Sequence, residues 1–250
     1  MPSQTKIIIL AAGKGKRMGG DIPKVLVRLN GKPLISYLLN SLKFLQIKEK
    51  PIVVVGFRAD MVKEELGDSM EYVFQKEQLG TGHAVMCAKD KIGTANKLIV
   101  LYGDMPNIKL KTINNLLELH NNESPVLTMM TIKVPNFENE YAGFMGFGRV
   151  IRNEDGNIKK IVEIRDADEK EKKVTELNPS LFCFDSSWLL SNLDKLTNKN
   201  AQEEYYLTDL VGLAIEEGKK ISSLEISPME CVGVNTPEEL RYAETIVSNF

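Results

Sequence analysis

The chain has 250 residues, of which 43% are hydrophobic and 26% charged, and 32 basic against 34 acidic residues give a net charge of −2. This composition excludes disordered, collagen-like and disulfide-rich proteins, and the small net charge indicates neither a nucleic-acid partner nor an anionic membrane partner. The three cysteines, Cys87, Cys183 and Cys231, are odd in number and far apart, which favours a reducing compartment.

The amino-terminal segment holds one short apolar run, within residues 1–13. It is too short for a signal peptide or for the roughly 20 apolar residues of a membrane span. We therefore expect a cytoplasmic protein.

The first half of the chain alternates short β-branched runs with helical patterns. Buried strands are predicted at residues 6–13, 51–56, 71–75, 97–104 and 125–134. Apolar residues recur at helical spacing in residues 33–47, 59–67, 81–92 and 110–122. This alternation predicts an α/β fold with a doubly wound, Rossmann-like sheet, mixed but mostly parallel, and helices on both faces.

The second half mixes strands and helices less regularly. Residues 148–164 predict a hairpin, and residues 179–196 predict a strand followed by a helix that Asp185 or Ser186 caps. A helix at 205–220 is expected to end at Gly218.

The tail predicts strands at 221–226 and 231–235 and then a helix with Thr236 as cap and Pro237 at its first position. We expect a single domain over residues 1–250. Its parts are a nucleotide-binding half up to about 135, a smaller inserted β-rich lobe at about 136–235, and a C-terminal helix at 237–248.

The loop after the first strand, within the stretch ILAAGKGKRM, contains Gly13 and Gly15. Ligands of open α/β sheets bind beyond the carboxyl ends of the strands, and paired glycines let backbone N–H groups approach an anion. Positive charge comes from Lys14, Lys16, Arg17 and Lys24. Both an anion-binding loop and a solvated basic turn fit this pattern.

Two common phosphate-binding motifs do not fit this loop. The P-loop spacing and its hydroxyl after lysine are missing, and a third glycine comes too late, at Gly19, for the dinucleotide fingerprint. The second predicted strand also lacks the acid that would hold a ribose. A dehydrogenase is therefore excluded.

Eight further motifs follow in order: PKVL (23–26), NGKPLISYLL (30–39), QKEQLGTGHAV (75–85), YGDMP (102–106), FGRVIR (147–152), IVEIRDA (161–167), LTNKNAQEEYYLTD (196–209) and GVN (233–235). Together they resemble the sugar-phosphate nucleotidyltransferase superfamily, and most closely the uridyltransferase domain of bacterial N-acetylglucosamine-1-phosphate uridyltransferases. The resemblance covers nearly the whole chain. It implies a nucleotide-diphospho-sugar transferase fold in which UTP and a sugar-1-phosphate react with Mg²⁺ as cofactor.

The resemblance also implies roles for individual residues. Arg17 would hold the β- and γ-phosphates of UTP and Lys24 the reacting phosphates, while Asp104 and Asn235 would bind Mg²⁺. A carboxylate at the end of a buried strand suits a hard cation that takes oxygen ligands. A carboxylate that caps the following turn is the alternative for Asp104, and a turn residue before Thr-Pro is the stronger alternative for Asn235, which only its pairing with Asp104 raises to a metal ligand.

The resemblance assigns two further groups of contacts. Those to the nucleotide are Leu10, Ala11, Ala12, Gly13, Gln75, Gly80 and Thr81. Those to the sugar are Tyr102, Gly148, Glu163, Asn178, Glu204 and Tyr206. The Gln75 amide offers both a donor and an acceptor to a pyrimidine edge. His83 is interpreted as a helix-start residue and His120 as an exposed helix end, so neither is placed in the site.

Several positions depart from the family pattern. The usual NTG is Asn178-Pro179-Ser180, the glycine before EYYLTD is Glu203, the tyrosine of GYGR is Phe147, and the segment 136–145 is longer than expected. All lie on the sugar side, so the sugar stays open, whereas Gln75 favours a pyrimidine. The first alternative is therefore the same reaction with another sugar-1-phosphate or another nucleotide. A sugar-nucleotide-binding regulatory protein without turnover is the second alternative, disfavoured because Arg17, Lys24, Asp104 and Asn235 are all present.

The family's usual members continue into a left-handed β-helix that carries acetyltransfer and forms a trimer. The sequence contains no hexapeptide repeat. We therefore expect no acetyltransferase activity and a monomer or weak dimer.

Overall fold

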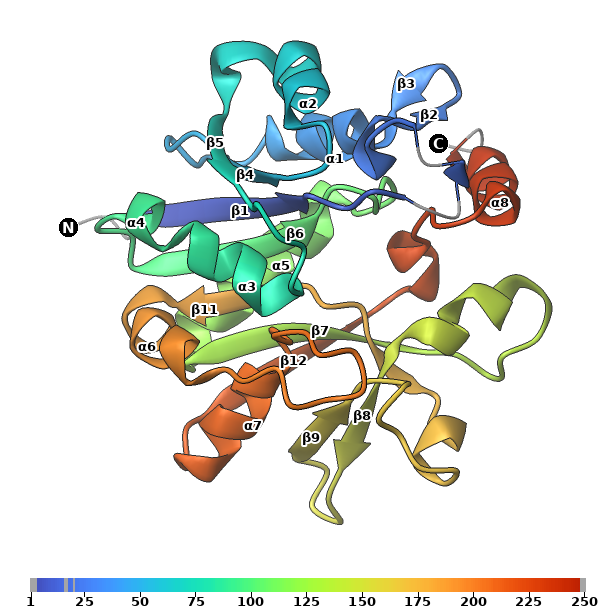
Figure 1. Cartoon of the computed structure of the whole chain (residues 1–250). Helices are drawn as coiled ribbons and strands as arrows, with labels where there is room; N and C mark the ends of the chain where they lie inside the picture. Colours follow the sequence, from blue (N-terminus) through green and yellow to red (C-terminus); the bar gives the residue numbers. More distant parts are fainter. Residues whose placement is uncertain (1–3, 16–17, 20, 248–250) are drawn as a thin grey trace.

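The computed structural model describes residues 4–15, 18–19 and 21–247. Its centre is a ten-stranded mixed sheet in the order β5-β4-β1-β6-β11-β7-β10-β8-β9, with β12 paired to β7 (Figure 1). The strands are β1 (Thr5–Ala11), β4 (Ile52–Val55), β5 (Glu71–Phe74), β6 (Lys97–Tyr102), β7 (Leu127–Lys133), β8 (Gly148–Arg152), β9 (Ile158–Val162), β10 (Glu176–Asn178), β11 (Phe182–Asp185) and β12 (Ile221–Ile226). The predicted α/β sheet is confirmed.

Helices cover both faces of this sheet because its central strands are apolar on both sides. The helices are α1 (Leu34–Leu42), α2 (Ala59–Leu66), α3 (Thr81–Cys87), α4 (Lys89–Ile92), α5 (Leu110–Glu123), α6 (Ser186–Asn192), α7 (Asp209–Glu216) and α8 (Pro237–Val247). Ile7 and Ile9 of β1 pack into one core with α1, α2, α5 and α8. Ile8 points the other way, into a second core with α3, α4, α6 and α7.

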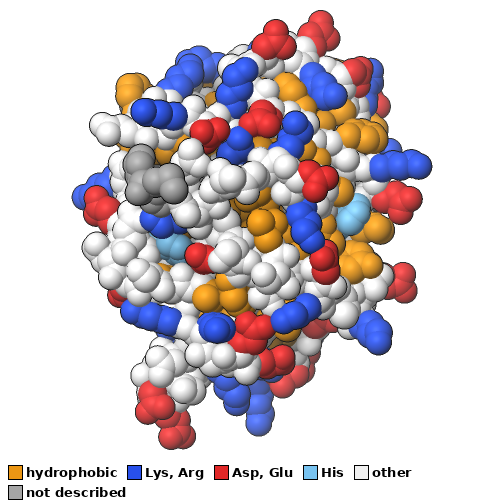
Figure 2. Space-filling view, turned by 90° about the vertical axis from the view of Figure 1, so that its left-hand side faces the viewer, with side chains coloured by type: hydrophobic (Ala, Val, Ile, Leu, Met, Phe, Trp, Pro, Cys, Tyr) orange, Lys and Arg blue, Asp and Glu red, His pale blue; other side chains and the backbone are white. Residues whose placement is uncertain are grey.

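The parallel strands set the position of the candidate site. β1 runs parallel to β4 and β6, and β4 runs parallel to β5. Their carboxyl ends therefore meet at one edge, which lies on the right in Figure 1, on the same side as α8. On the opposite face, near the start of β1, acidic and basic side chains are interspersed (Figure 2).

β7 joins the two halves of the sheet. One of its edges pairs with β11 at Leu127–Met129 and with β10 at Ile132–Lys133, while its other edge pairs with β12. β10 and β11 are thus two parts of one line of strand, interrupted at residues 179–181. β11 pairs onward with β6 and β10 with β8, so the interruption marks the change from the nucleotide half to the inserted lobe.

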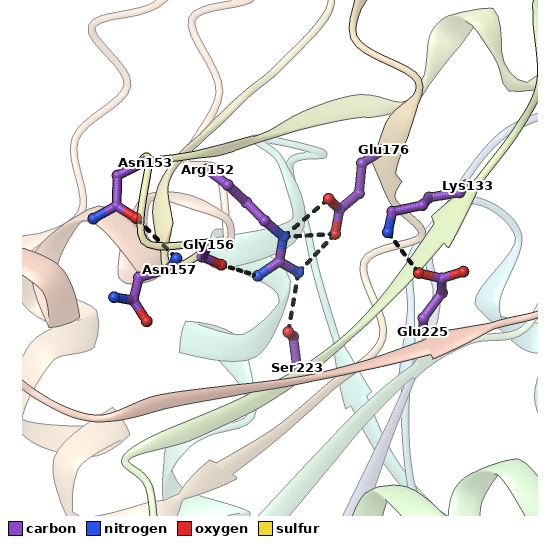
Figure 3. Close-up of polar contacts among 8 residues, drawn as sticks. All are labelled: Lys133, Arg152, Asn153, Gly156, Asn157, Glu176, Ser223 and Glu225. Atoms are coloured by element: carbon purple, nitrogen blue, oxygen red, sulfur yellow. Dashed lines mark hydrogen bonds and ion pairs between the residues drawn. The ribbon is translucent and has the colours of Figure 1, made fainter.

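A polar cluster ties the β8–β9 hairpin to this framework (Figure 3). The Arg152 guanidinium donates to both oxygens of Glu176, with Nε–Oε2 and Nη2–Oε1 distances of 2.9 and 2.6 Å. It also donates to Ser223 Oγ on β12 at 3.1 Å and to the Gly156 carbonyl of the hairpin turn at 2.8 Å. One arginine thereby connects three strands and a turn.

Several predicted boundaries are confirmed. Asp185 caps α6 because its carboxylate accepts the Trp188 N–H at 2.8 Å. Gly218, with φ +63°, follows the end of α7 as expected. Helix α7 itself begins only at Asp209, four residues later than predicted. The predicted helix at 81–92 is divided at Ala88 into α3 and α4.

Two predictions were wrong. Residues 231–235 form no strand, because the chain leaves β12 at Pro228 in a 3₁₀ turn, Pro228–Cys231, and then runs across the strand ends. His120 is not exposed: α5 packs its last turn against β7, where the His120 ring is 3% exposed and Nδ1 lies 2.9 Å from Thr128 Oγ1. Burial lowers the pKa of His120 to about 4.

None of the described helices is long and apolar enough to cross a membrane.

Candidate functional site

A cavity of about 230 Å³ opens at the carboxyl ends of β1, β5 and β6. The residues predicted for the site that line it are Leu10, Ala11, Ala12, Gly13, Lys24, Gln75, Gly80, Thr81, Tyr102, Asp104 and Glu204. Residues 10–13, 75–81 and 102–104 converge here because β1, β5 and β6 end at the same edge of the sheet. Glu204 comes from the loop before α7, which is held beside them by the hydrogen bond from the Tyr205 N–H to the Leu79 carbonyl at 2.8 Å. The structure therefore brings most of the predicted site into one place.

The opening loop is shaped to bring Lys24 back to the end of β1. Lys24 begins a 3₁₀ turn, Lys24–Leu26, and its N–H donates to the Gly13 carbonyl at 3.4 Å. Gly15 has φ +64°, and a Cβ there would lie 3.1 Å from Lys24 Cβ. A larger residue would be strained in its backbone and crowded by the lysine. Arg17 and Lys16, which were predicted for this loop, lie outside the described residues.

Lys24 meets the two predicted metal-binding side chains at the mouth of the cavity. Its ammonium group donates to Asp104 Oδ2 and to Asn235 Oδ1. The side chains of Lys24 and Asp104 are 14% and 19% exposed, so the ion pair is largely shielded from water. A positive charge thus lies between a carboxylate and an amide oxygen that are far apart in the sequence, at positions 104 and 235.

These two oxygens also suit a divalent cation. Mg²⁺ is commonly bound through one or two protein oxygens, with waters and substrate phosphates completing its octahedron. The Lys24 ammonium already lies where such a cation would contact Asp104 and Asn235. Within the described residues no group of three or more His, Cys, Asp or Glu forms a metal cluster. The donor set therefore fits a metal that is shared with substrate rather than a closed structural site.

Asn235 is held in place by a residue that the sequence analysis did not select. The Glu239 carboxylate accepts the N–H of Asn235 at 2.5 Å and that of Thr236 at 3.1 Å, and the Glu239 N–H donates to Thr236 Oγ1 at 3.2 Å. This is a capping box, which confirms Thr236 as the cap of α8. The T-x-x-E spacing at 236–239 was the available sequence signal.

The other end of the cavity is formed by Gln75 and the segment after it. Gln75 is 3% exposed, and its Nε2 lies 3.1 Å from the Gly80 carbonyl oxygen and 3.1 Å from His83 Nδ1. Gly80 has φ +103°, and a Cβ there would lie 2.6 Å from the Tyr205 carbonyl oxygen. Glycine is therefore required where residues 204–205 press against this loop. His83 lies in the first turn of α3, in agreement with its interpretation as a helix-start residue, but its contact with Gln75 was missed.

The remaining predicted sugar residues do not line this cavity but lie together beside it. Asn178 of β10 pairs with Gly148 of β8. A Cβ on Gly148 would be 3.3 Å from Glu163 Oε1, so the glycine leaves room for that carboxylate. The Thr208 hydroxyl donates to Glu163 Oε1 at 2.9 Å. The Leu207 N–H donates to Thr81 Oγ1 at 3.1 Å, which links this group to the cavity.

Burial and neighbouring negative charges raise the pKa values of the acidic side chains on the sugar side. Burial raises the pKa of Glu163, the Thr208 hydrogen bond opposes it, and the nearby Asp209, Asp166 and Glu204 raise it further. Burial likewise raises the pKa of Glu204 and brings that of Tyr206 to about 12. The Tyr206 hydroxyl donates to Asp166 Oδ2 at 3.3 Å. Such a group of acceptors suits a ligand rich in hydroxyl groups.

The model of the MobA-like NTP transferase domain matches residues 7–203 of the chain. The chain belongs to this family. It is a nucleotidyltransferase domain, and the nucleotide end of the cavity and the Lys24–Asp104 pair both fall within the matched residues.

Relatives that match this NTP transferase domain include two bacterial proteins named bifunctional protein GlmU. The one from Clostridium acetobutylicum is 41% identical over 235 residues, which cover 93% of this chain and 50% of that protein. The one from Limosilactobacillus fermentum is 40% identical over 242 residues, covering 96% of this chain and 51% of that protein. The chain thus spans about half the length of these relatives.

Solved structures share the fold at lower sequence identity. A UDP-glucose pyrophosphorylase complexed with UDP-glucose superposes with a TM-score of 0.77 at 16% identity, covering 98% of this chain and 99% of that one. A CMP-2-keto-3-deoxy-manno-octonic acid synthetase complexed with CTP superposes with a TM-score of 0.70 at 18% identity, covering 99% of each chain. The chain therefore shares its fold with these nucleotide-sugar enzymes.

The NTP transferase domain has a second, larger cavity of about 360 Å³ on the far side of Asn235. It lies between α8 and a 3₁₀ segment, Asn139–Gly146, that belongs to the long stretch noted in the sequence. Asn235 is the one predicted site residue among those that line it. We place the site in the smaller cavity, because the charged and polar residues predicted for the chemistry converge there.

Proposed function

We propose that this domain transfers a uridylyl group from UTP to N-acetylglucosamine-1-phosphate, with Mg²⁺ as cofactor, and releases pyrophosphate. The observation that carries the proposal is the meeting of Lys24, Asp104 and Asn235 at the mouth of a cavity that Gln75 closes at the other end. The identity of about 41% to the bifunctional protein GlmU over half of its length supports this choice of substrates.

The chemical difficulty of this reaction is electrostatic. A phosphate oxygen of the sugar-1-phosphate attacks the α-phosphorus of UTP, the bond from that phosphorus to the bridging oxygen breaks, and pyrophosphate carries away the negative charge. Positioning and charge stabilisation supply most of the catalysis in such transfers. Asp104 and Asn235 would hold Mg²⁺, which neutralises phosphate charge when bound.

The residues of the chain divide the remaining tasks. The Lys24 ammonium reaches the same point as the two metal-binding oxygens, so it can neutralise charge on the reacting phosphates as a point charge. Backbone N–H groups of the first loop and the Gln75 amide would bind the base. Glu163, Asn178 and the segment 204–208 would orient the sugar hydroxyls beside the α-phosphate.

One observation favours a close relative of N-acetylglucosamine-1-phosphate as acceptor. Ser180, where the family usually has glycine, has φ +61°. Its N–H donates to Asn178 Oδ1 at 2.9 Å, and its Oγ accepts from Asn178 Nδ2 at 3.2 Å. A hydroxyl group therefore competes with the ligand for the Asn178 amide, and a sugar with different substituents is the second candidate substrate.

Pyrophosphate release with Mg²⁺ tests the proposal. UTP, CTP, dTTP and GTP are each combined with the 1-phosphates of N-acetylglucosamine, glucose and N-acetylgalactosamine. We expect turnover with UTP and N-acetylglucosamine-1-phosphate to exceed every other pair. A preference for another sugar would support the second candidate, and absence of turnover from folded protein would favour a regulatory nucleotide-sugar-binding protein.

A further inference from the structure

The side-chain amide of Gln75 has a fixed orientation in the cavity wall. Gln75 follows β5 directly, and its own N–H pairs with the Val55 carbonyl, so the backbone continues the sheet register. The residue is only 3% exposed. Its Nε2 is surrounded by two acceptors, the Gly80 carbonyl oxygen and His83 Nδ1, each at 3.1 Å.

The chemistry of these partners decides which amide atom faces them. A backbone carbonyl can only accept hydrogen bonds, so the amide nitrogen and not the oxygen must face Gly80. The two hydrogens of Nε2 are then used by Gly80 and His83. Within the described residues Oε1 makes no hydrogen bond, and Gln75 lines the cavity. The amide therefore offers a carbonyl acceptor to the ligand.

His83 can accept this hydrogen bond in only one tautomer. Nδ1 must be unprotonated, which places the proton on Nε2, 3.8 Å from Cys87 Sγ one helical turn further on. The Tyr205 ring, whose centroid lies 6.2 Å from that of His83, packs beside the imidazole. His83 is thus held between α3 and the segment that presses on Gly80.

We propose that His83 is a positioning residue which, together with the Gly80 carbonyl, turns the Gln75 carbonyl oxygen into the cavity and so selects a pyrimidine that donates an N–H. Uracil and thymine carry hydrogen on N3, whereas cytosine presents a bare N3 acceptor that would face another acceptor. The inference rests on the proposed nucleotide substrate but not on the sugar or on turnover. It assigns the choice between uridine and cytidine nucleotides to an amide orientation rather than to cavity size.

Direct nucleotide binding tests the inference without requiring catalysis. Isothermal titration of the full chain with UTP and with CTP gives a ratio of the two dissociation constants. We expect the wild-type chain to favour UTP by about 100-fold or more, because mispaired buried acceptors are rejected strongly. In His83→Leu, the amide loses one of its two restraints, and the UTP preference is expected to fall about tenfold.

Two matched variants distinguish positioning from a general structural effect. The Oδ1 atom of asparagine can replace Nδ1, so His83→Asn is expected to restore the preference. Cys87→Ala removes the contact on the other ring nitrogen and is expected to leave the preference unchanged. Circular dichroism and Tm establish that each variant is folded.

Three outcomes would overturn the inference: equal binding of UTP and CTP by the wild type, an unchanged ratio in His83→Leu, or the same loss in all three variants. A shifted ratio in a protein that turns over no sugar-1-phosphate would support the inference and contradict the proposed reaction instead.

Discussion

Lys24 and Asp104 form an ion pair across 80 residues of sequence, and Asn235 shares the same ammonium group. The oxygens that hold this lysine are those proposed to bind Mg²⁺. Under the proposed function the lysine and the metal would therefore compete for one place, and we expect the ammonium to move toward the substrate phosphates when the cation binds.

Replacing Lys24 should separate metal binding from turnover. In Lys24→Met the carboxylate of Asp104 loses its counter-ion, so we expect Mn²⁺, used as a probe for Mg²⁺, to bind several-fold more tightly by calorimetry. Turnover should nevertheless fall by about 10²–10³, as for loss of one group that stabilises the transition state. Lys14→Met is the control, since the Lys14 ammonium lies over the Phe57 ring at 5.0 Å. Unchanged metal affinity in Lys24→Met would show that the two cations do not compete.

Glu239 should act on the metal through Asn235. In Glu239→Gln the capping amides lose a charged acceptor, and the stability of α8 should fall by about 0.5–2 kcal/mol. Because Asn235 then loses its orientation, the Mg²⁺ concentration for half-maximal rate should rise several-fold. Glu238→Gln is the matched control, because Glu238 pairs with Arg241 on the surface, where its side chain is 72% exposed. Equal shifts in the two variants would argue against a role for Glu239 in positioning Asn235.

Glu203 should be a site of stored backbone strain. It has φ +56° where the family usually has glycine, and it is exposed. Glu203→Gly should raise the free energy of unfolding by about 0.5–1 kcal/mol, because relief of left-handed strain exceeds the added chain entropy of glycine. Ala201 lies in the same loop and has no positive φ, so Ala201→Gly should lower the free energy of unfolding. Denaturant unfolding measures both, and a destabilised Glu203→Gly would refute this account.

Arg152 should contribute strongly to stability. Its removal in Arg152→Leu leaves Glu176, whose side chain is 11% exposed, without its bidentate partner. We expect a loss of about 2–4 kcal/mol in the free energy of unfolding, since an unpaired buried charge is costly. Lys133→Ala breaks the neighbouring pair with Glu225, both 55% exposed, and should change the free energy of unfolding much less than Arg152→Leu does, because solvent screens an exposed pair. Urea unfolding of both variants compares the pairs directly, and equal losses would contradict the difference in burial.

Glu163 should contribute more to the stability of the folded protein as the pH falls. Its pKa is raised in the folded state, chiefly by burial, so the folded protein binds this proton more tightly than the unfolded chain does. The contribution of Glu163 to the free energy of unfolding is therefore unfavourable above the folded pKa, and it improves as the pH falls toward the unfolded pKa of about 4.3. Thermal unfolding from pH 7 to 5 should show a smaller gain or a larger loss of Tm on acidification in Glu163→Gln than in the wild type. Parallel curves would contradict this assignment.

Local sequence patterns were sufficient to predict most of the strands and helices that form the sheet framework. The apolar runs of β1, β4 and β6 predicted a parallel sheet, and Asp104 follows a strand whose end had to lie at the ligand edge. β5 was also predicted as a buried strand, but it lies at the edge of the sheet, where Phe74 is 57% exposed. The Asn30-Gly31 turn, with φ of +48° and +79°, is a two-residue hairpin signal that was present in the sequence and not used.

The missed features depend on contacts distant in sequence. The break between β10 and β11 arises because β7 offers one edge to two strands with different outer neighbours, β8 and β6. The segment 231–235 has the composition of a strand, yet its path follows from the position of Asp104, whose carbonyl accepts the Val234 N–H at 3.3 Å. His83 joined the site through Gln75, a relation between side chains that no local period reveals.

The continuity of β7 limits how the protein can close on its substrates. From Leu127 to Ile132 this strand is hydrogen-bonded to β12 on one edge, and on the other it holds both β11 and β10. A bend between the nucleotide half and the inserted lobe would have to break the backbone hydrogen bonds of β7 in the middle of the sheet. Any gating movement is therefore expected in the segments that carry no strand, such as 136–147 and 197–206, while the catalytic framework stays rigid.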